Sequence, residues 1–507
     1  MRNVCSVRTA AICAVALFFV PFARSAVSAE EVAQDPKGLR IGRGAQLFVD
    51  DYLTENMEKV TRTFHQAQKH PNNPIIRGDG PGEEEYAILY GSVLRKDDEY
   101  WMYYYAPNGL PENNWRTQRL AISKDGVHWT RPKLGLIELE GSKENNIVVS
   151  YQTHSGFMEG LEPVEDPNPA DPEKRYRGYF FGGHWSRDKV TKHKDRPRGT
   201  YSAWSADGLH WHCSEKPDPA LGGHDRLGLC YDTLKNRWIA FTKENTKYGR
   251  ERWLSFSQDL ENFTPRQPLL RGTKYKDLYY NNCFVYGGMY LGLLNVFDHN
   301  ELILDLHLIT SRDGQHWERP KTGKPLIPVG DVGDWDRFNN SPAGSAPLRI
   351  GDKLYFYYGG RSYRHGTSTS SAPPERFTDS LPGSAWGGRT FLCGIGLATL
   401  RVDGFASLDS TFNTGVVTTK PLHLPSGQLH VNAKCDFGTV KVEVLDAEGN
   451  PLPGYALADC NVLHADSVDQ PVTWKEKQDL AGVTGSPVRL RFHLTNARLY
   501  SFRVADQ

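Results

Sequence analysis

Short aromatic and β-branched runs recur along the chain, each bounded by Gly, Asp, Asn or Pro. A polar turn leading into such a run occurs five times, beginning at residues 97, 171, 232, 287 and 351. Aromatic and β-branched side chains favour strands because they suit a pleated, half-buried surface. The pattern therefore predicts a large, turn-rich β protein rather than a helical one.

A second repeat, Ser-x-Asp-Gly-x-His-Trp, follows these runs. Intact copies begin at Ser123, Ser205 and Ser311, Ser257 begins a decayed copy, and residues 402–405 form a weaker fifth. Asp-Gly between apolar runs is a strong hairpin signal because Gly takes the positive φ that the turn requires. Two hairpins in each of five units predict a five-bladed β-propeller over residues 40–409.

After Asp409 the pattern changes to alternation of apolar and polar residues, over 429–433, 439–444 and 488–494. A period of two predicts half-buried antiparallel strands, so residues 412–507 are expected to form a C-terminal β-sandwich. The predicted fold class is all-β, a propeller followed by a sandwich. Residues 46–53 are a further strand candidate, positioned to complete the last blade and close the ring.

Residues 1–29 have the pattern of a secretory signal peptide. Arg2 and Arg8 precede an uncharged stretch over residues 9–22, and small residues follow at 27–29. The stretch has 14 residues, fewer than the ~20 that span a bilayer. We expect an exported protein, secreted or periplasmic, that does not associate with the membrane after cleavage.

The composition narrows the classes of partner. Among 507 residues, 60 Lys+Arg balance 60 Asp+Glu, which argues against a nucleic-acid partner because that would require a basic stripe. Of the 8 Cys, two lie in the leader, and the remainder are too few for a disulfide scaffold in a chain of this length. No Cys-x-x-Cys or His-rich cluster suggests zinc, so we expect neither a metal nor a cofactor.

These features together resemble a known group. A propeller followed by a sandwich, with Ser-x-Asp-Gly-x-His-Trp turns and an early Asn73-Pro74-Ile-Ile, is similar to the superfamily of glycoside hydrolase families 32, 43, 62, 68, 117 and 130. The resemblance is closest to family 32 N-terminal-like propellers of secreted bacterial proteins and covers about residues 40–507. It implies action on glycosidic bonds through carboxylates at the axial end of the propeller. The invertase pattern Trp-Met-Asn-Asp-Pro-Asn-Gly is absent, and only Glu165-Asp166-Pro167 resembles a second-blade motif.

Strand order in a propeller blade predicts which positions share a face. The first strand runs along the central channel from the functional face, so inner-strand starts and the loops between second and third strands lie on that face. The Asp-Gly turns then lie on the opposite face. We therefore expect His128, His210 and His316, which belong to those turns, to be structural.

Glycoside hydrolysis requires two carboxyl groups in unlike environments, one a protonated acid and the other a base or nucleophile. A third can tune the pKa of the acid. The candidates are Glu83 or Glu85 as base, Glu159 or Asp166 as the tuning group, and Asp225 or Glu244 as acid.

Planar and polar side chains on the same face suit a sugar, because aromatic groups stack on the ring and polar groups bind its hydroxyls. The candidate substrate-binding residues are Asn108, Trp115, His154, His184, Arg187, Arg250, Tyr280, Asn340 and His365. The partner that this set predicts is a carbohydrate.

Two functions follow from these features. One is a hydrolase, or less readily a lyase or phosphorylase, that acts on a poly- or oligosaccharide. The other is a carbohydrate-binding propeller without catalysis, which the missing standard motifs favour. Three axial carboxylates near one another would favour the enzyme, whereas an apolar or Arg-only channel would favour binding.

Overall fold

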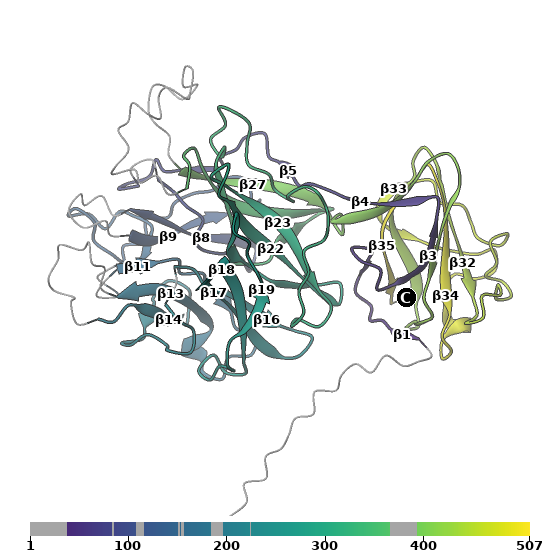
Figure 1. The fold of residues 1–507 in the computed structure, drawn as a ribbon, viewed down its shortest axis with the longest axis horizontal. Coiled ribbons are helices and arrows are strands. Elements are labelled where there is room, and N and C mark those ends of the chain that lie inside the picture. Colours follow the sequence, from purple (N-terminus) through teal and green to yellow (C-terminus); the bar gives the residue numbers. More distant parts are fainter. Residues whose placement is uncertain are drawn as a thin grey trace, which may run out of the picture.

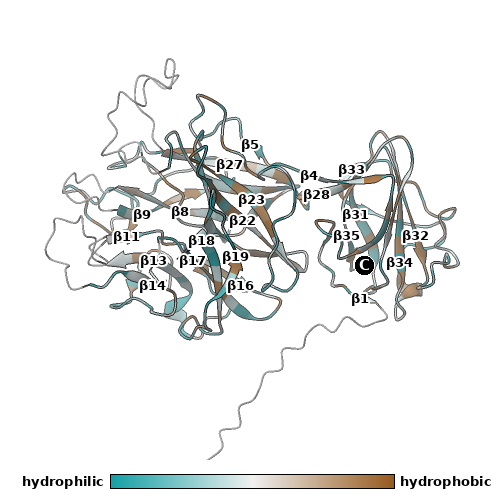
Figure 2. Ribbon diagram, in the orientation of Figure 1, coloured by the Kyte–Doolittle hydropathy of each residue, from teal (hydrophilic) through white to brown (hydrophobic). Residues whose placement is uncertain are grey.

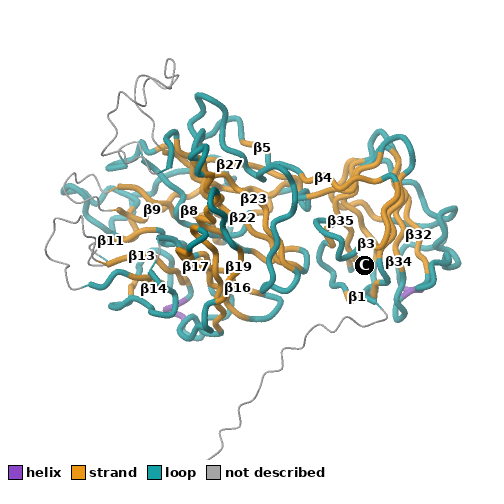
Figure 3. Tube along the Cα trace, in the orientation of Figure 1, coloured by secondary structure: helices purple, strands orange, loops and turns teal. Residues whose placement is uncertain are grey.

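The computed structural model describes residues 38–83, 86–107, 116–150, 153, 157–183, 196–223, 225–365 and 393–506. The predicted signal peptide lies outside these residues. In the described part, two 3-10 turns, Pro172–Lys174 and Ala481–Val483, accompany the strands, and no helix is long and apolar enough to cross a membrane (Figure 3). The prediction of an all-β chain is confirmed.

The larger body in Figure 1 begins with three separate antiparallel sheets. The first contains β7 (Val93–Lys96), β8 (Glu99–Pro107), β9 (Arg116–Ser123) and β10 (Ile147–Val149). In the second, β11 (Phe157–Glu159) and β12 (Val164–Glu165) both pair with β13 (Tyr176–Gly183), and β14 (Gly199–Ser205) and β15 (His212–Cys213) follow. The third contains β16 (Gly228–Asp232), β17 (Arg237–Thr246), β18 (Gly249–Ser257) and β19 (Gln267–Leu270).

Two further meanders are joined into one sheet by a parallel bridge between Leu304 and Asn339. One contains β20 (Lys276–Asn281), β21 (Phe284–Tyr286), β22 (Met289–Asp298) and β23 (Ile303–Ser311). The other contains β24 (Asn339–Pro342), β25 (Leu348–Ile350), β26 (Lys353–Arg361) and β27 (Cys393–Arg401). The order of the meanders along the chain is that of propeller blades, and the inner strand is divided in three of them, as β11 and β12, β20 and β21, and β24 and β25.

Aromatic residues of the first repeat form the second strands of the blades. Tyr103, Tyr104 and Tyr105 of β8 are all fully buried, because such a strand is covered by neighbouring blades on both of its faces. Figure 2 shows strands of mixed hydropathy, because tyrosine and other polar side chains are buried in these sheets beside apolar ones. This packing explains why these runs are continuously aromatic instead of alternating with polar residues.

The smaller body is a sandwich of two sheets. One contains β33 (Asp466–Pro471), β31 (Gln428–Lys434), β35 (Arg498–Ala505), β28 (Ala406–Ser410) and β4 (Val60–Phe64), with β2 (Gln46–Leu47) paired to β35. The other contains β3 (Thr54–Glu58), β29 (Gly415–Thr419), β34 (Arg489–Thr495) and β32 (Thr439–Leu445). A parallel pair, β1 (Leu39–Arg40) with β30 (Leu422–His423), flanks them. Buried Phe48, Phe492 and Phe502 contact one another in its core.

Two expectations about the N-terminal segment are corrected by these pairings. Residues 46–53 do not complete the last blade, since β2 pairs with β35 of the sandwich. The ring is closed instead by β5 (Gln68–Lys69) and β6 (Ile76–Arg77), which pair with β27. Because β2, β3, β4 and β28 belong to sandwich sheets, the predicted propeller range of 40–409 is too long at both ends. The local pattern marks a strand but does not encode a partner hundreds of residues away.

Candidate functional site

The inner strands of the second and third blades bring two carboxyl groups together at their starting ends. Glu159 is the last residue of β11, and Asp225 comes shortly before β16. Gly160, with φ +76°, lies between them, and a Cβ at this position would come within 3.0 Å of the carbonyl oxygen of Asp225. The glycine allows this close approach of the two backbones, and so the carboxyl of Glu159 and that of Asp225 interact electrostatically.

Glu159 is the more protected of the two carboxyl groups. Its side chain is 13% exposed, and its Oε1 accepts a hydrogen bond of 2.5 Å from Nη1 of Arg116. Burial raises the pKa of Glu159, and the negative charge of Asp225 raises it further, while Arg116 opposes both. The pKa lies above the ordinary glutamate value, which favours the protonated carboxyl.

Asp225 has the opposite electrostatic environment. Burial disfavours its charge, but an ion pair with Lys243 and the nearby charges of Arg250 and Arg226 outweigh burial and lower its pKa to about 2. Asp225 is therefore a carboxylate throughout the neutral and mildly acidic range. This contradicts its assignment as the acid, because a general acid must carry a proton.

Aromatic and cationic side chains surround the two carboxyl groups. Nη2 of Arg361 donates a hydrogen bond of 2.8 Å to the hydroxyl of Tyr90. Arg250 lies 4.5 Å from the ring centre of Tyr279, and the ring of His365 contacts Tyr279 edge-on at 4.8 Å. Burial and the charges of Arg361 and Arg250 lower the pKa of His365 to about 4. The predicted substrate-binding residues Arg250 and His365 therefore lie at this site, and His365 is uncharged near neutral pH.

A second ionic cluster adjoins the first through Arg226, which follows Asp225 in the chain. Nε of Arg226 donates a hydrogen bond of 2.6 Å to Glu162, and both side chains are 2% exposed. The guanidinium stacks 3.5 Å from the ring centre of Tyr280, whose hydroxyl donates to Glu162. Tyr280, predicted to bind substrate, is fully buried and instead orients Arg226 and Glu162.

Asn340 likewise lies inside the protein. Its side chain is completely buried, and Nδ2 donates a hydrogen bond of 2.8 Å to the carbonyl of Pro328. Burial disfavours its prediction as a substrate-binding residue, although its Oδ1 has no hydrogen-bond partner among the described residues. Both Asn339 and Asn340 at the start of β24 are buried, so the first residues of this inner strand are not exposed at the surface.

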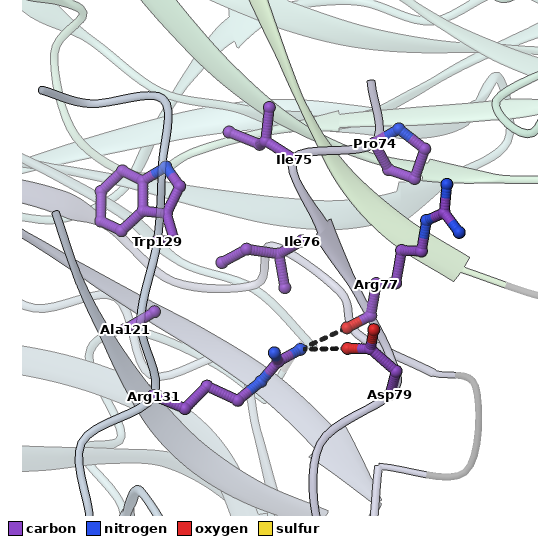
Figure 4. Close-up of a pocket in the computed structure, with 8 residues that line it drawn as sticks. All are labelled: Pro74, Ile75, Ile76, Arg77, Asp79, Ala121, Trp129 and Arg131. Carbon is purple, nitrogen blue, oxygen red and sulfur yellow. Dashed lines mark hydrogen bonds and ion pairs between the residues drawn. The ribbon is translucent and has the colours of Figure 1, made fainter. Parts of the chain in front are cut away.

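Glu83, predicted as base, is also buried away from the axial pair. Its carboxylate accepts hydrogen bonds from the hydroxyl of Tyr104 and, at 2.9 Å, from Nη2 of Arg131. Arg131 also pairs with Asp79, and together with Trp129 these two residues line a pocket of about 280 Å³ (Figure 4). With no exposed surface, Glu83 anchors the loop between β6 and the first blade.

Two other predicted carboxyl groups point elsewhere. Glu244 follows Lys243 in β17, so its side chain lies on the other face of the sheet, where it pairs with Arg266. Asp166 accepts a hydrogen bond of 3.0 Å from the amide of Asn168. It lines a pocket that also includes Asp259 of the decayed repeat turn, and thus lies on the face opposite the axial pair.

Six predicted site residues lie outside the described part of the chain, and their assignments stay predictions. They are Glu85, Asn108, Trp115, His154, His184 and Arg187.

The residues of the site that were not among the candidates from sequence include Tyr90, Arg116, Glu162, Arg226 and Lys243. Lys243 could have been predicted from the alternation of side chains along β17. Successive side chains of a strand point to opposite faces, so Lys243 and Glu244 cannot both point to the site. Arg226 could have been predicted from its adjacency to Asp225. Within the described residues, no group of three or more His, Cys, Asp or Glu side chains is arranged to hold a metal ion.

The chain matches no protein-family profile and no curated protein sequence. Among solved structures it is similar to a β-1,2-mannobiose phosphorylase from Listeria innocua, with 12% identity, a TM-score of 0.41, and 67% of this chain and 97% of that one covered. It is also similar to a thermostable family-43 glycoside hydrolase, with 11% identity, a TM-score of 0.40 and coverages of 67% and 95%. For an exo-inulinase from Aspergillus awamori the identity is 10%, the TM-score 0.40 and the coverages 84% and 99%. At such identities the likeness concerns the fold, not the chemistry of the site.

Proposed function

We propose that this chain is an exported glycoside hydrolase in which Glu159 is the general acid and Asp225 the ionised carboxylate. The observation that carries the proposal is the close approach of two carboxyl groups with unequal surroundings. Asp225 pairs with Lys243 and lies near Arg250 and Arg226, which lowers its pKa, whereas burial raises the pKa of Glu159. Two carboxyl groups with pKa values driven apart have the acid and base assignments that glycoside hydrolysis requires. Aromatic faces and Arg side chains around them suit a sugar.

In this mechanism Glu159 donates its proton to the glycosidic oxygen as the bond to the anomeric carbon breaks. Asp225 stabilises the positive charge that develops on the sugar, and serves as nucleophile or as the base that activates water. Lys243 keeps Asp225 ionised, and Arg116 holds the carboxyl of Glu159 in position. If Asp225 is the nucleophile, water then attacks the anomeric carbon, the bond to Asp225 breaks, and the water proton passes to Glu159. If Asp225 is the base, it takes the proton of the attacking water, and solvent reprotonates Glu159.

Two conservative variants test the proposal on a panel of polysaccharides, with released reducing ends as readout. Glu159→Gln removes the transferable proton and Asp225→Asn removes the charge, and each is expected to reduce turnover about 10²- to 10⁴-fold. Glu244→Gln is the matched control, since this carboxyl belongs to the same blade as Asp225 but pairs with Arg266. Wild-type turnover by both axial variants would refute the proposal.

A second candidate is carbohydrate binding without turnover. The observation that favours it is that each axial carboxyl already has a cation partner, Arg116 for Glu159 and Lys243 for Asp225. This candidate predicts that the purified protein binds a polysaccharide of the panel and releases no sugar, and that Glu159→Gln leaves the affinity unchanged.

The export step is tested separately, because it depends on residues 1–29 alone. Sequencing the N-terminus of the protein recovered from its native compartment is expected to give Glu30 as the first residue. An intact N-terminus on the mature protein would contradict cleavage.

A further inference from the structure

Besides Arg226, which pairs with Glu162, four cationic side chains lie around the axial carboxyl groups: Arg116, Lys243, Arg250 and Arg361. The first two are neutralised locally, since Arg116 pairs with Glu159 and Lys243 with Asp225. The other two come from different blades, Arg250 from β18 and Arg361 from the end of β26. Their charges are the ones available to a ligand.

Arg361 has no acidic partner. Its guanidinium donates to the hydroxyl of Tyr90 and lies 5.4 Å from that ring centre, and in the described part of the chain no carboxylate forms an ion pair with it. A guanidinium held by a neutral phenol keeps its full charge. It also keeps donors that are free to bind a further acceptor.

Arg250 is only weakly neutralised. Its Nε lies 3.8 Å from Oδ2 of Asp277, and the same carboxylate oxygen lies 3.3 Å from Nε2 of His299. Nη1 of Arg250 is buried and, among the described residues, has no hydrogen-bond partner. Leaving a buried donor of a charged group without an acceptor costs free energy. A ligand oxygen that accepts a hydrogen bond from Nη1 of Arg250 would remove this cost.

The lowered pKa of His365 indicates a positive electrostatic potential close to these two arginines. After burial, the charges of Arg361 and Arg250 are the main causes that lower its pKa, and they outweigh the opposing charge of Asp225. Protonation of Glu159 in its proposed role as acid would remove one more negative charge. The site is therefore positive in the state in which it would meet substrate.

The geometry points to an anionic glycan as ligand, with a carboxylate or sulfate group on the sugar bound by Arg361 and Arg250. This inference deepens the proposed function and rests on it for the position of the scissile bond. A planar guanidinium fork binds such oxyanions through paired, charge-assisted hydrogen bonds. A neutral sugar would displace water from both arginines without supplying a charge, which disfavours it.

The experiment compares charged oligosaccharides with neutral forms of the same backbone. One arm uses trigalacturonate and its carboxyl-reduced form, and the other a sulfated carrageenan tetrasaccharide and its desulfated form. Affinity is measured by calorimetry on Glu159→Gln protein and turnover on protein with Glu159 intact. Binding of at least one charged ligand is expected to exceed that of its neutral form, and to weaken as NaCl is raised because surface charges are screened.

Arg361→Gln and Arg250→Gln are each expected to weaken binding of the preferred charged ligand about 10- to 100-fold, the usual loss for a hydrogen-bonded charge partner. Arg271→Gln, at an exposed arginine outside the site, is expected to leave it unchanged. Equal binding of charged and neutral forms, no binding of either charged ligand, or insensitivity to both arginine variants would overturn the inference.

The arms separate this inference from the proposed function. Turnover of neutral glycans alone, unaffected by Arg361→Gln, leaves a hydrolase and removes the anionic substrate. Arginine-dependent binding of a charged glycan without turnover supports the anionic ligand and removes the hydrolase.

Discussion

Glu159 and Asp225 are neighbours that differ in how many cations stand close to them. Glu159 has Arg116 beside it and the carboxylate of Asp225 nearby, and burial dominates its pKa. Asp225 has Lys243 in contact and Arg250 and Arg226 behind it, and together these cations outweigh burial. Because more cations lie close to Asp225 than to Glu159, two carboxyl groups take different protonation states, and one can act as acid and the other as carboxylate.

This difference predicts the pH dependence of kcat/KM. The acid works when protonated, so the rate should fall as pH rises through the raised pKa of Glu159. The carboxylate works when ionised, so the rate should fall on the acidic side only near the pKa of Asp225, about 2. We expect a rate that is flat between the two pKa values and declines as pH rises through that of Glu159, measured on the substrate that the panel identifies.

Two variants are expected to shift the acidic limb and the alkaline limb of the pH profile of kcat/KM separately. Arg116→Gln removes the cation that opposes the raised pKa of Glu159, so the alkaline limb should move to higher pH. Lys243→Met removes the main cation that lowers the pKa of Asp225, so the acidic limb should move to higher pH. Movement of the alkaline limb to lower pH in Arg116→Gln would contradict the role of Glu159.

The sequence predicted which strand ends carry the axial carboxyl groups, but it did not predict where every side chain lies. The repeat turns fix which end of each inner strand lies on the functional face, and Glu159 and Asp225 follow from that. The burial of Glu83 depends on Arg131, which lies 48 residues further along the chain. No local pattern carries such information. Glu244 was predicted instead of its neighbour Lys243 for a different reason. Side chains alternate between the two faces of a strand, so an error of one residue selects the wrong face.

At the scale of the element, the Ser-x-Asp-Gly-x-His-Trp turn is a self-contained unit of hydrogen bonds. In the copy at Ser311, the serine hydroxyl accepts from the amide of Gly314, and Asp313 accepts from the amides of Gln315 and His316. The imidazole of His316 lies 2.6 Å from the same carboxylate. The copies at Ser123 and Ser205 repeat these contacts, and the exposed histidines are accounted for by the turn.

One aromatic residue departs from the repeat. Nε1 of Trp211 and that of Trp317 donate to the glycine carbonyl of their own turns, at 2.9 and 3.2 Å. Nε1 of Trp129 has no hydrogen-bond partner among the described residues, and Trp129 lines the pocket in Figure 4. The repeated motif therefore predicts the turn but not the hydrogen bond of the tryptophan that ends it.

The turn predicts a loss of stability when its carboxylate is removed. Asp313→Ala leaves the amides of Gln315 and His316 without their acceptor and is expected to cost about 1–2 kcal/mol of unfolding free energy. Thermal unfolding followed by circular dichroism measures the loss, with Lys321→Ala, an exposed residue of the same blade, as control. An unchanged midpoint for Asp313→Ala would show that the turn is held by its surroundings.

The same carboxylate gives that stability a pH dependence. Its turn contacts lower the folded-state pKa of Asp313 to about 2, against 3.8 ordinarily. The stabilisation is therefore complete above the ordinary value and is lost as pH falls towards 2. The difference in midpoint between Asp313→Ala and unaltered protein should shrink over that interval, and a constant difference would contradict the assignment.

At the scale of the whole molecule, the sandwich is built from both ends of the described chain. β4 pairs with β28 along five residues, from Phe64 with Ala406 to Val60 with Ser410. β3 pairs with β29. In Figure 1 the purple N-terminal strands accordingly lie among the yellow C-terminal ones.

This arrangement predicts how shortened chains behave. A chain of residues 38–405 keeps β3 and β4 but lacks their partners, so exposed strand edges should make it aggregate. A chain of residues 65–405 lacks both sides of the pairing and should be more soluble and more monomeric by size-exclusion chromatography. The opposite order of solubility would contradict the pairing.

The discontinuous sandwich also has a consequence for the time course of folding. Glu58 and Val416 are register partners separated by about 350 residues, and everything between them must be synthesised before they can pair. Each blade, by contrast, closes from hairpins whose strands are neighbours in the chain. Because distant contacts carry a larger loop-closure cost and form more slowly, the blades should gain protection from hydrogen exchange first. The first strands to be made should be among the last to be protected.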